Sequence, residues 1–303
     1  MKKLISILLS LVFCTMSSGI AQVTTDVPYK TPAMGALMGS NIALSETASS
    51  VFLNPATLNT TEHGFVLFST QKVFNQSFLP YNVFSAGLDL PNGFGKLGIS
   101  FESMSVNYRD ETLSGETAIG LSHAFTLREE RVSTLNMGYT VKYMSVDYGQ
   151  SAGLSGDGSD GLDLGNATAF GFDLGFQATL SKRHWLGVVV HNINRPQIGS
   201  GSATSMLPRD IQAGFSYAPT RQVVTSFSLV SSPGLTSEFH GGLEYELNPY
   251  LTLRGGIQSV PNRFGAGFSF QANGLELDYT ILTHPILPAT HQFSFAYGFQ
   301  SIF

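Results

Sequence analysis

Ionisable side chains recur singly in segments where polar and apolar residues alternate. Because successive side chains on a strand point to opposite faces, these groups are expected to share the face opposite an aromatic one. They could line a selective passage, or they could pair as a salt-bridge network that fills a narrow interior, and we favour the network. The residues of this polar lining are Lys96, Glu102, Lys142, Asp173, Glu238, His240, Glu244, Glu246, Arg254, Arg263, Glu276 and Asp278.

The residue types used in catalysis are present without a catalytic arrangement. The seven histidines are scattered and form no H-x-x-x-H pair, so we predict no metal site and no cofactor. We expect no G-x-S-x-G or other nucleophile context for a catalytic triad of Ser, His and Asp, so we predict no catalytic residue. The single cysteine, Cys14, lies near the start of the chain and offers no disulfide framework. We expect a protein that is not an enzyme.

The glycine-rich stretch 148–165 places Asp157, Asp160 and Asp163 three residues apart. Carboxylates on a flexible loop can hold calcium weakly. An EF-hand needs acidic residues two apart at its start, so this spacing is not that of an EF-hand. We favour a solvated outer loop, and the sequence leaves calcium binding open.

The start of the chain and its charge content indicate the compartment. Lys2 and Lys3 precede an apolar run over residues 4–13, and small residues lead up to Ala21. This pattern predicts a signal peptide over residues 1–21, cleaved near Ala21, because about ten apolar residues are too few to cross a bilayer. Charged residues make up only 12 %, and the net charge of −5 argues against nucleic acid as a partner.

Period-two alternation recurs in segments of about ten residues from residue 64 onward. In residues 168–180, Phe170 and Phe172 share one face, while Asp173 lies on the other among glycines, which we interpret as points where the backbone curves. No apolar stretch after residue 22 approaches the roughly eighteen residues of a membrane helix. We therefore predict an all-β fold, a transmembrane antiparallel up-and-down β-barrel of about fourteen strands. The predicted strands are 64–71, 82–90, 94–108, 112–126, 132–147, 166–181, 184–193, 207–218, 222–231, 235–247, 250–259, 263–271, 274–283 and 289–303.

The lengths of the links between these strands alternate. The links after even-numbered strands are short, and those after odd-numbered strands include 72–81, 148–165 and 194–206. Bacterial barrels have short periplasmic turns and longer outer loops, so the parity of the links agrees with the strand count.

The last predicted strand ends the chain with alternating aromatic residues. A terminal aromatic residue on such a strand resembles the signal read by the outer-membrane barrel assembly machinery. The residues assigned to this signal are Phe295, Tyr297, Phe299 and Phe303. We predict that the mature protein lies in the outer membrane of a Gram-negative bacterium, with outer-membrane lipid around it.

Residues 22–63 precede the first strand and alternate too weakly to be part of the wall. Ser45 is suited to be the N-cap of a short helix with Glu46 in its first turn. Pro55 disfavours a helical conformation at Asn54, so this helix should end there. Asn54 can then cap a second turn with Pro55 in its first position. The prediction is a helix–kink–helix element of small residues.

The stretch "AMGALMGSNIALSETASSVFLNPATL" resembles the N-terminal signature of FadL-like outer-membrane proteins, especially the PorV/PorQ family. The pattern departs from that signature at Glu46, where an acidic pair is reduced to one residue, and at Thr57, where glycine is usual. The hairpin around Thr283-His284-Pro285 also resembles the last hairpin of the family. The residues that match the N-terminal signature are Gly35, Ala36, Gly39, Asn54, Pro55, Ala56 and Leu58.

The resemblance implies a plug (hatch) formed by residues 22–63 inside a barrel formed by residues 64–303. Its motif residues would be Gly35, Gly39, Asn54, Pro55, Ala56 and Leu58. It also implies a function in the type IX protein secretion pathway, in which the protein binds a secretion translocon and its cargo proteins. The alternative is a FadL-like channel for long-chain fatty acids or other hydrophobic compounds. The short outer loops favour the secretion role.

Overall fold

The computed structural model describes residues 27–45, 48–61, 64–108, 111–149, 151, 153–154, 160–199 and 204–299. The predicted signal peptide 1–21 with its cleavage near Ala21, and the residues Glu46, Asp157 and Phe303, lie outside the described residues. No helix in the described part of the chain is long and apolar enough to span a membrane.

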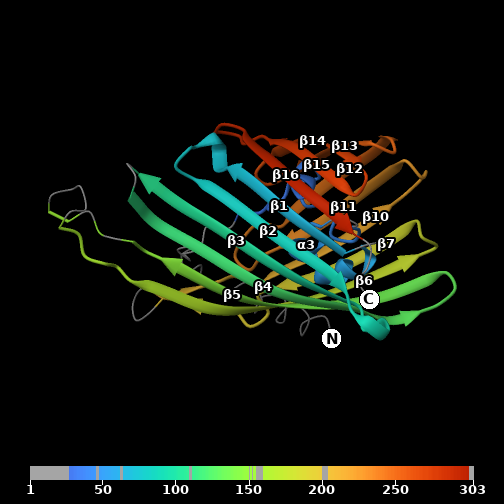
Figure 1. The fold of residues 1–303 in the computed structure, drawn as a ribbon, viewed down its shortest axis with the longest axis horizontal. Helices are drawn as coiled ribbons and strands as arrows, with labels where there is room; N and C mark the ends of the chain where they lie inside the picture. Colours follow the sequence, from blue (N-terminus) through green and yellow to red (C-terminus); the bar gives the residue numbers. More distant parts are fainter. Residues whose placement is uncertain are drawn as a thin grey trace, which may run out of the picture.

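The described strands form a closed antiparallel barrel of 14 strands, which confirms the predicted fold class (Figure 1). Each strand pairs with its neighbour along the chain, and β16 closes the barrel against β1, with Phe295 opposite Phe68. The barrel strands are β1 (Gly64–Lys72), β2 (Pro80–Asp89), β3 (Lys96–Tyr108), β4 (Glu111–Glu129), β5 (Ser133–Asp147), β6 (Asn166–Leu180), β7 (His184–His191), β10 (Asp210–Tyr217), β11 (Val223–Ser231), β12 (Glu238–Asn248), β13 (Leu251–Gln258), β14 (Arg263–Ala272), β15 (Leu275–Leu282) and β16 (Thr290–Phe299).

A small hairpin interrupts the sequence between β7 and β10. Its strands β8 (Gln197–Ile198) and β9 (Ser205–Met206) pair with each other outside the barrel sheet, so that β7 pairs directly with β10. Ile198 is fully buried in a cluster with Val146 and Ala169. The sequence predicts only a long link here, because strands of two residues are too short to show a period.

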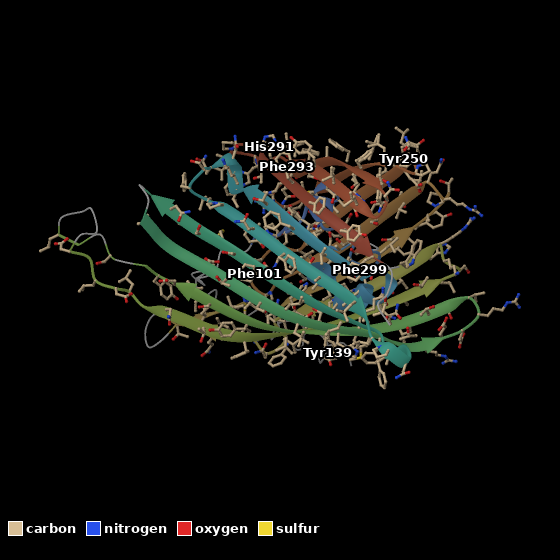
Figure 2. All side chains as sticks on the ribbon, viewed as in Figure 1. Phe101, Tyr139, Tyr250, His291, Phe293 and Phe299 are labelled. Atoms are coloured by element: carbon tan, nitrogen blue, oxygen red, sulfur yellow. The ribbon has the colours of Figure 1, made fainter. Side chains whose placement is uncertain are left out.

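The alternation along each strand separates outward apolar side chains from inward polar ones. On β6, Phe170 and Phe172 are exposed on the outside, whereas Asp173 and Gln177 are buried inside. Figure 2 shows aromatic side chains such as Phe101 pointing away from the barrel. This arrangement is typical of a barrel whose outer surface contacts lipid.

The two ends of the barrel differ. The end at which β1 begins and β16 ends carries the short links 130–132, 181–183, 249–250 and 273–274, and we call it the short-turn end. The opposite end carries the longest links, and we call it the long-loop end. The strands are also uneven, because β4 has 19 residues whereas β7 has 8. As a result β3–β6 extend beyond the other strands at the long-loop end (Figure 1).

The described residues from 27 to 61, which we call the N-terminal segment, are largely buried inside the barrel. They form α2 (Pro32–Ala36), α3 (Ser50–Leu53) and the 3₁₀ helix η1 (Pro55–Thr60). The helix α2 packs against β13–β16, and η1 packs against β3–β6. Two further 3₁₀ turns, η2 (Val73–Asn75) and η3 (Pro91–Gly93), lie in links.

The predicted start of the segment's helix is wrong, and its predicted end is correct. The helix α3 begins at Ser50 with Ser49 as N-cap, not after Ser45. Ser45 does not act as a cap, because its hydroxyl has no hydrogen-bond partner among the described residues. Asn54 has an extended conformation, and Pro55 begins η1 as predicted.

The helix α2 has no counterpart in the sequence analysis. Thr31 caps it, since the hydroxyl of Thr31 accepts a hydrogen bond from the Met34 N–H, and Pro32 occupies the first turn. A threonine followed by proline is a recognised start signal for a helix, so the sequence carried this information.

Candidate functional site

Glycines on the inner face of the wall make room for the N-terminal segment. A Cβ built on Gly187 would lie 2.6 Å from the Cα of Ala43, and one on Gly256 would lie 2.5 Å from the carbonyl carbon of Leu37. Real Cβ atoms essentially never approach other atoms this closely. Any larger residue at these positions would therefore displace the segment. The glycines that meet the segment in this way are Gly138, Gly175, Gly187, Gly242, Gly256 and Gly265, which we call the glycine seat.

The glycine seat was not predicted from the sequence, where these glycines were interpreted as points at which the backbone curves. Their shared signal is a register in which inward glycines face one another on paired strands. Gly138 lies opposite Gly175, and Gly256 lies opposite both Gly242 and Gly265. Glycines that recur at inward positions of neighbouring strands thus indicate a backbone that passes close to the wall.

Asn54 joins the N-terminal segment to the wall. Its side-chain amide donates to the carbonyl of Ile42 at 3.1 Å and to the carbonyl of Phe176 on β6 at 3.2 Å. Its carbonyl oxygen accepts from the Ala56 N–H at 3.1 Å. Asn54 is fully buried, and all its amide groups are used in these contacts. Asn54 therefore fixes the kink and ties it to β6.

The other motif residues lie in two places. Pro55 and Ala56 approach Gly138 on β5, and Leu58 is fully buried in an apolar cluster with Val51, Phe65 and Leu67. Gly35 lies on the opposite side of the lumen beside Gln292 of β16, and Gly39 has a φ of +65°, which favours glycine. The structure thus places the motif along both contacts between segment and wall.

At the long-loop end, wall residues pair with the start of the segment. Lys30 forms an ion pair with Glu102 at 2.7 Å, and Glu102 also accepts from the Tyr81 hydroxyl at 2.7 Å. The Tyr29 hydroxyl donates to Gln258 at 2.6 Å. Burial is the main cause that raises the pKa of Tyr29 well above its ordinary value, so the phenol remains a donor.

Two further polar groups of the wall stand near these contacts. Asp173 pairs with Lys142 at 2.8 Å and with His191 at 2.9 Å. Glu238 accepts from Gln258 at 2.6 Å and contacts His240 at 3.1 Å. Arg263 belongs to β14, and its Nε has no hydrogen-bond partner among the described residues.

At the short-turn end, a second network surrounds Arg254. Its guanidinium pairs with Glu244, contacts Asp278 at 3.3 Å and lies 4.0 Å from Glu276. Ser269 bridges Arg254 and Asp278. These residues come from four neighbouring strands, β12–β15, so the network joins the wall to itself.

Lys96 forms a separate contact near the same end. It pairs with Asp89 at 3.1 Å and donates to the backbone carbonyl and hydroxyl of Thr61, where the N-terminal segment meets the wall.

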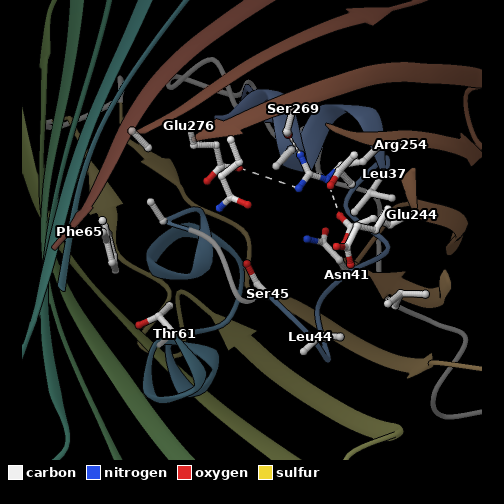
Figure 3. Close-up of a pocket in the computed structure, with 18 of the residues that line it drawn as sticks. Leu37, Asn41, Leu44, Ser45, Thr61, Phe65, Glu244, Arg254, Ser269 and Glu276 are labelled. Carbon is white, nitrogen blue, oxygen red and sulfur yellow. Dashed lines mark hydrogen bonds and ion pairs between the residues drawn. The ribbon is translucent and has the colours of Figure 1, made fainter. Parts of the chain in front are cut away.

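Two cavities lie on either side of the N-terminal segment. The long-loop cavity has a volume of about 500 Å³, and Met34 and Phe52 of the segment line it. The short-turn cavity has a volume of about 420 Å³, and Leu37, Asn41 and Ser45 of the segment line it (Figure 3). Because α2 contributes residues to both, the segment separates the two cavities.

Three of the residues assigned to the barrel-assembly signal, Phe295, Tyr297 and Phe299, belong to β16. Phe295 and Tyr297 are exposed, and the rings of Tyr297 and Phe299 stack with centroids 6.5 Å apart. Exposed aromatic residues at this edge of a barrel are suited to the interface between lipid and water.

The described residues include no group of three or more His, Cys, Asp or Glu placed to hold a metal ion. The expectation that the chain has no G-x-S-x-G pattern is wrong, because the sequence from Gly149 to Gly153 has this form. The pattern lies in the link between β5 and β6. A nucleophile elbow requires a strand that turns directly into a helix, so this match does not indicate a catalytic serine.

Comparisons with known proteins identify the fold. A family model described as "F plasmid transfer operon, TraF, protein" matches residues 93–269. No curated protein sequence matches the chain. The solved structure of the CymD monoaromatic hydrocarbon channel is similar with a TM-score of 0.62 and 12 % identity, over 91 % of this chain and 99 % of that one.

Two further solved structures share the same architecture. The Pseudomonas putida toluene transporter TodX has a TM-score of 0.60 at 12 % identity, over 91 % of this chain and 100 % of that one. A Pseudomonas aeruginosa FadL homologue has a TM-score of 0.55 at 12 % identity, over 90 % of this chain and 99 % of that one. At this level of identity the likeness establishes a FadL-like barrel fold.

Proposed function

The chain belongs to the family described as "F plasmid transfer operon, TraF, protein", and we propose that it is an outer-membrane channel for hydrophobic compounds. The family description names an operon and no ligand, so the ligand class rests on the fold and the lumen. The observation that carries the proposal is a FadL-like barrel with a cavity on each side of an internal segment. Proteins with this fold include a monoaromatic hydrocarbon channel and a toluene transporter.

The long-loop cavity offers an apolar surface for such compounds. Met34, Phe52 and Leu53 of the segment line it together with Met104 of β3, and all four belong to one buried apolar cluster. Flexible methionine side chains suit ligands of varied shape. An apolar compound is expected to bind on this surface before it passes the segment.

The orientation follows from the two ends of the barrel. We place the long-loop end at the cell surface and the short-turn end in the periplasm, since outer loops are the longer ones in bacterial barrels. Residues 1–21 act as signal peptide, residues 22–63 as plug and residues 64–303 as barrel. Phe295, Tyr297, Phe299 and Phe303 serve the barrel assembly machinery.

The proposed plug action is supported by the glycine seat and by the contact between the two helices of the segment. The hydroxyls of Thr31 and Ser49, at the starts of α2 and α3, lie 2.7 Å apart and both are fully buried. Deletion of residues 33–58 should leave a barrel that inserts and conducts small ions more freely than the full chain in planar bilayers. Unchanged conductance would contradict the plug assignment.

Uptake tests the ligand class. Cells that express the chain in place of their own hydrocarbon channel should take up radiolabelled toluene faster than cells with an empty vector. Met34→Lys places a charge on the apolar surface and should reduce this uptake. Equal uptake with and without the chain would overturn the proposal.

A secretion role is the second candidate, supported by the N-terminal motif that resembles the PorV/PorQ family. In that case the protein would bind a translocon and cargo proteins of the type IX pathway. Purification of the native protein from outer membranes distinguishes the two functions. Recovery with a large translocon barrel or secreted cargo supports secretion, and recovery with a bound hydrophobic compound supports the channel. Both functions are non-enzymatic.

A further inference from the structure

The short-turn cavity contains more negative than positive groups. Glu244, Asp278 and Glu276 all lie within 4.0 Å of a single guanidinium, that of Arg254. Glu246 also lines the cavity. The nearby Lys96 is paired with its own carboxylate, Asp89. Arg254 can therefore neutralise only part of the charge of its neighbours.

The imbalance matters because these carboxylates lie inside the barrel. Glu276 has a side chain that is 14 % exposed and stands at the far end of the Arg254 network, at 4.0 Å. A carboxylate removed from water is costly unless a cation or a proton compensates it. Glu276 faces the cavity (Figure 3), so a cation that enters from the short-turn end can reach it.

The N-terminal segment contributes two hydrogen-bond acceptors to the same cavity. Asn41 is 5 % exposed and Ser45 is 2 % exposed. The Asn41 Oδ1 and the Ser45 Oγ have no hydrogen-bond partner among the described residues. Both residues line the cavity, and Figure 3 shows Ser45 directed toward its centre. Buried polar atoms are seldom left without a partner, so these two indicate a missing donor.

Apolar side chains complete the lining. Leu37 and Leu44 of the segment and Phe65 of β1 line the cavity and are at most 9 % exposed. The volume of about 420 Å³ is far larger than a single ion needs. The cavity therefore combines an anionic end with an apolar wall and room for an organic molecule.

We propose that the short-turn cavity binds a small organic cation, a primary ammonium on an apolar body. The ammonium group donates to Glu276 and to the unpaired oxygens of Ser45 and Asn41, and the body packs on Leu37, Leu44 and Phe65. Three donors on an ammonium group match three acceptors from wall and segment. This site goes beyond the proposed passage of hydrophobic compounds and does not require it.

Equilibrium binding tests the site separately from transport. The full mature chain in detergent is titrated by calorimetry with 2-phenylethylammonium, with phenylacetate and 2-phenylethanol as probes of similar shape and different charge. We expect binding of the ammonium compound only. Equal binding of all three compounds, or preference for phenylacetate, would overturn the proposal, and so would the absence of any ammonium binding.

Two variants identify the residues. Glu276→Gln keeps the shape of the side chain and should weaken ammonium binding by about tenfold, since it removes a charged hydrogen bond. Ser45→Val removes only the hydroxyl and should weaken binding severalfold. Glu129→Gln removes the same charge from an exposed position and is the control that should leave binding unchanged. If Glu276→Gln and Glu129→Gln bind alike, attraction to the net charge explains the binding and the site is wrong.

Discussion

The two cavities are similar in size but differ in what their charged groups hold together. At the long-loop end, Lys30 and Tyr29 of the N-terminal segment pair with Glu102 and Gln258 of the wall. At the short-turn end, every partner of Arg254 belongs to the wall. The first set of contacts holds the segment in place, and the second holds neighbouring strands together. Closure of the lumen and stability of the barrel should therefore respond to different substitutions.

Arg254 provides the largest expected effect. Arg254→Met leaves the buried Asp278 without its cation, and loss of one partner of a buried ion pair costs about 3–5 kcal/mol. The barrel should unfold at a lower denaturant concentration in detergent, as followed by circular dichroism. Arg128→Met is the matched control, because Arg128 pairs with Glu130 in an exposed short turn and should cost less than about 1 kcal/mol. If both variants lose a similar amount of unfolding free energy, the Arg254 network does not stabilise the wall.

Two adjacent glycines on the same strand, β13, provide a test of the glycine seat and its control. A leucine at the inward Gly256 would collide with the backbone of Leu37, whereas Gly255 has only one atom, at 3.9 Å, near its Cβ position. Gly256→Leu should displace the segment and raise the conductance of the reconstituted barrel. Gly255→Leu should leave conductance unchanged. If the conductance of the Gly256→Leu variant equals that of the unmodified barrel, the glycine seat does not hold the segment.

Lys30 tests the charged contact of the segment. Lys30→Met removes the ion pair between Lys30 and Glu102. The side chain of Lys30 is 22 % exposed and that of Glu102 is 14 % exposed. We expect hydrogen exchange in α2 and the residues after it to accelerate by about fivefold, because partly exposed pairs contribute about 1 kcal/mol. Lys182→Met, at an exposed turn, is the control. The denaturation midpoint of the barrel should not change, and a large shift would contradict the separation of the two roles.

His284 should give the smallest effect, confined to the link 283–289. Its Nδ1 accepts from the N–H groups of Ile286 at 3.2 Å and Leu287 at 3.0 Å. Burial, followed by the charge of Arg263, lowers the pKa of His284. A protonated Nδ1 cannot accept, so this link is stabilised above the ordinary histidine pKa of about 6.5 and loosens as the pH falls below it.

Amide exchange of Ile286 and Leu287, corrected for intrinsic rates, should therefore increase between about pH 7.5 and about pH 5. The variant His284→Gln has no group that titrates in this range and should lose the pH dependence. A pH dependence that persists in this variant would exclude His284 as its cause.

The wall was predictable from the sequence because its signal is local. Each strand shows its outward and inward residues directly, as Phe170 and Asp173 do on β6. The break at Asn54-Pro55 was also predictable, since proline restricts the residue before it.

The contents of the lumen were less predictable because they depend on partners far away in the sequence. The chain before α3 is held by distant side chains, since Asn54 and Gln177 donate to the carbonyls of Ile42 and Ala43. Pairings such as Lys30 with Glu102 join residues 72 positions apart. No local pattern reports such contacts, although the inward glycines on paired strands did report the path of the segment.

The unequal strand lengths have a consequence for the cell surface in the proposed orientation. A strand of 19 residues such as β4 is about 65 Å long. A strand tilted by about 45° crosses an apolar band of about 25 Å in about 35 Å. Nearly half of β4 would thus stand clear of the membrane, next to its shorter neighbours β3 and β5, which have 13 and 15 residues. On this flank the part of the protein outside the membrane would be a β-sheet whose backbone groups are already hydrogen-bonded. An antibody or phage that binds there would contact a rigid sheet and not a flexible loop.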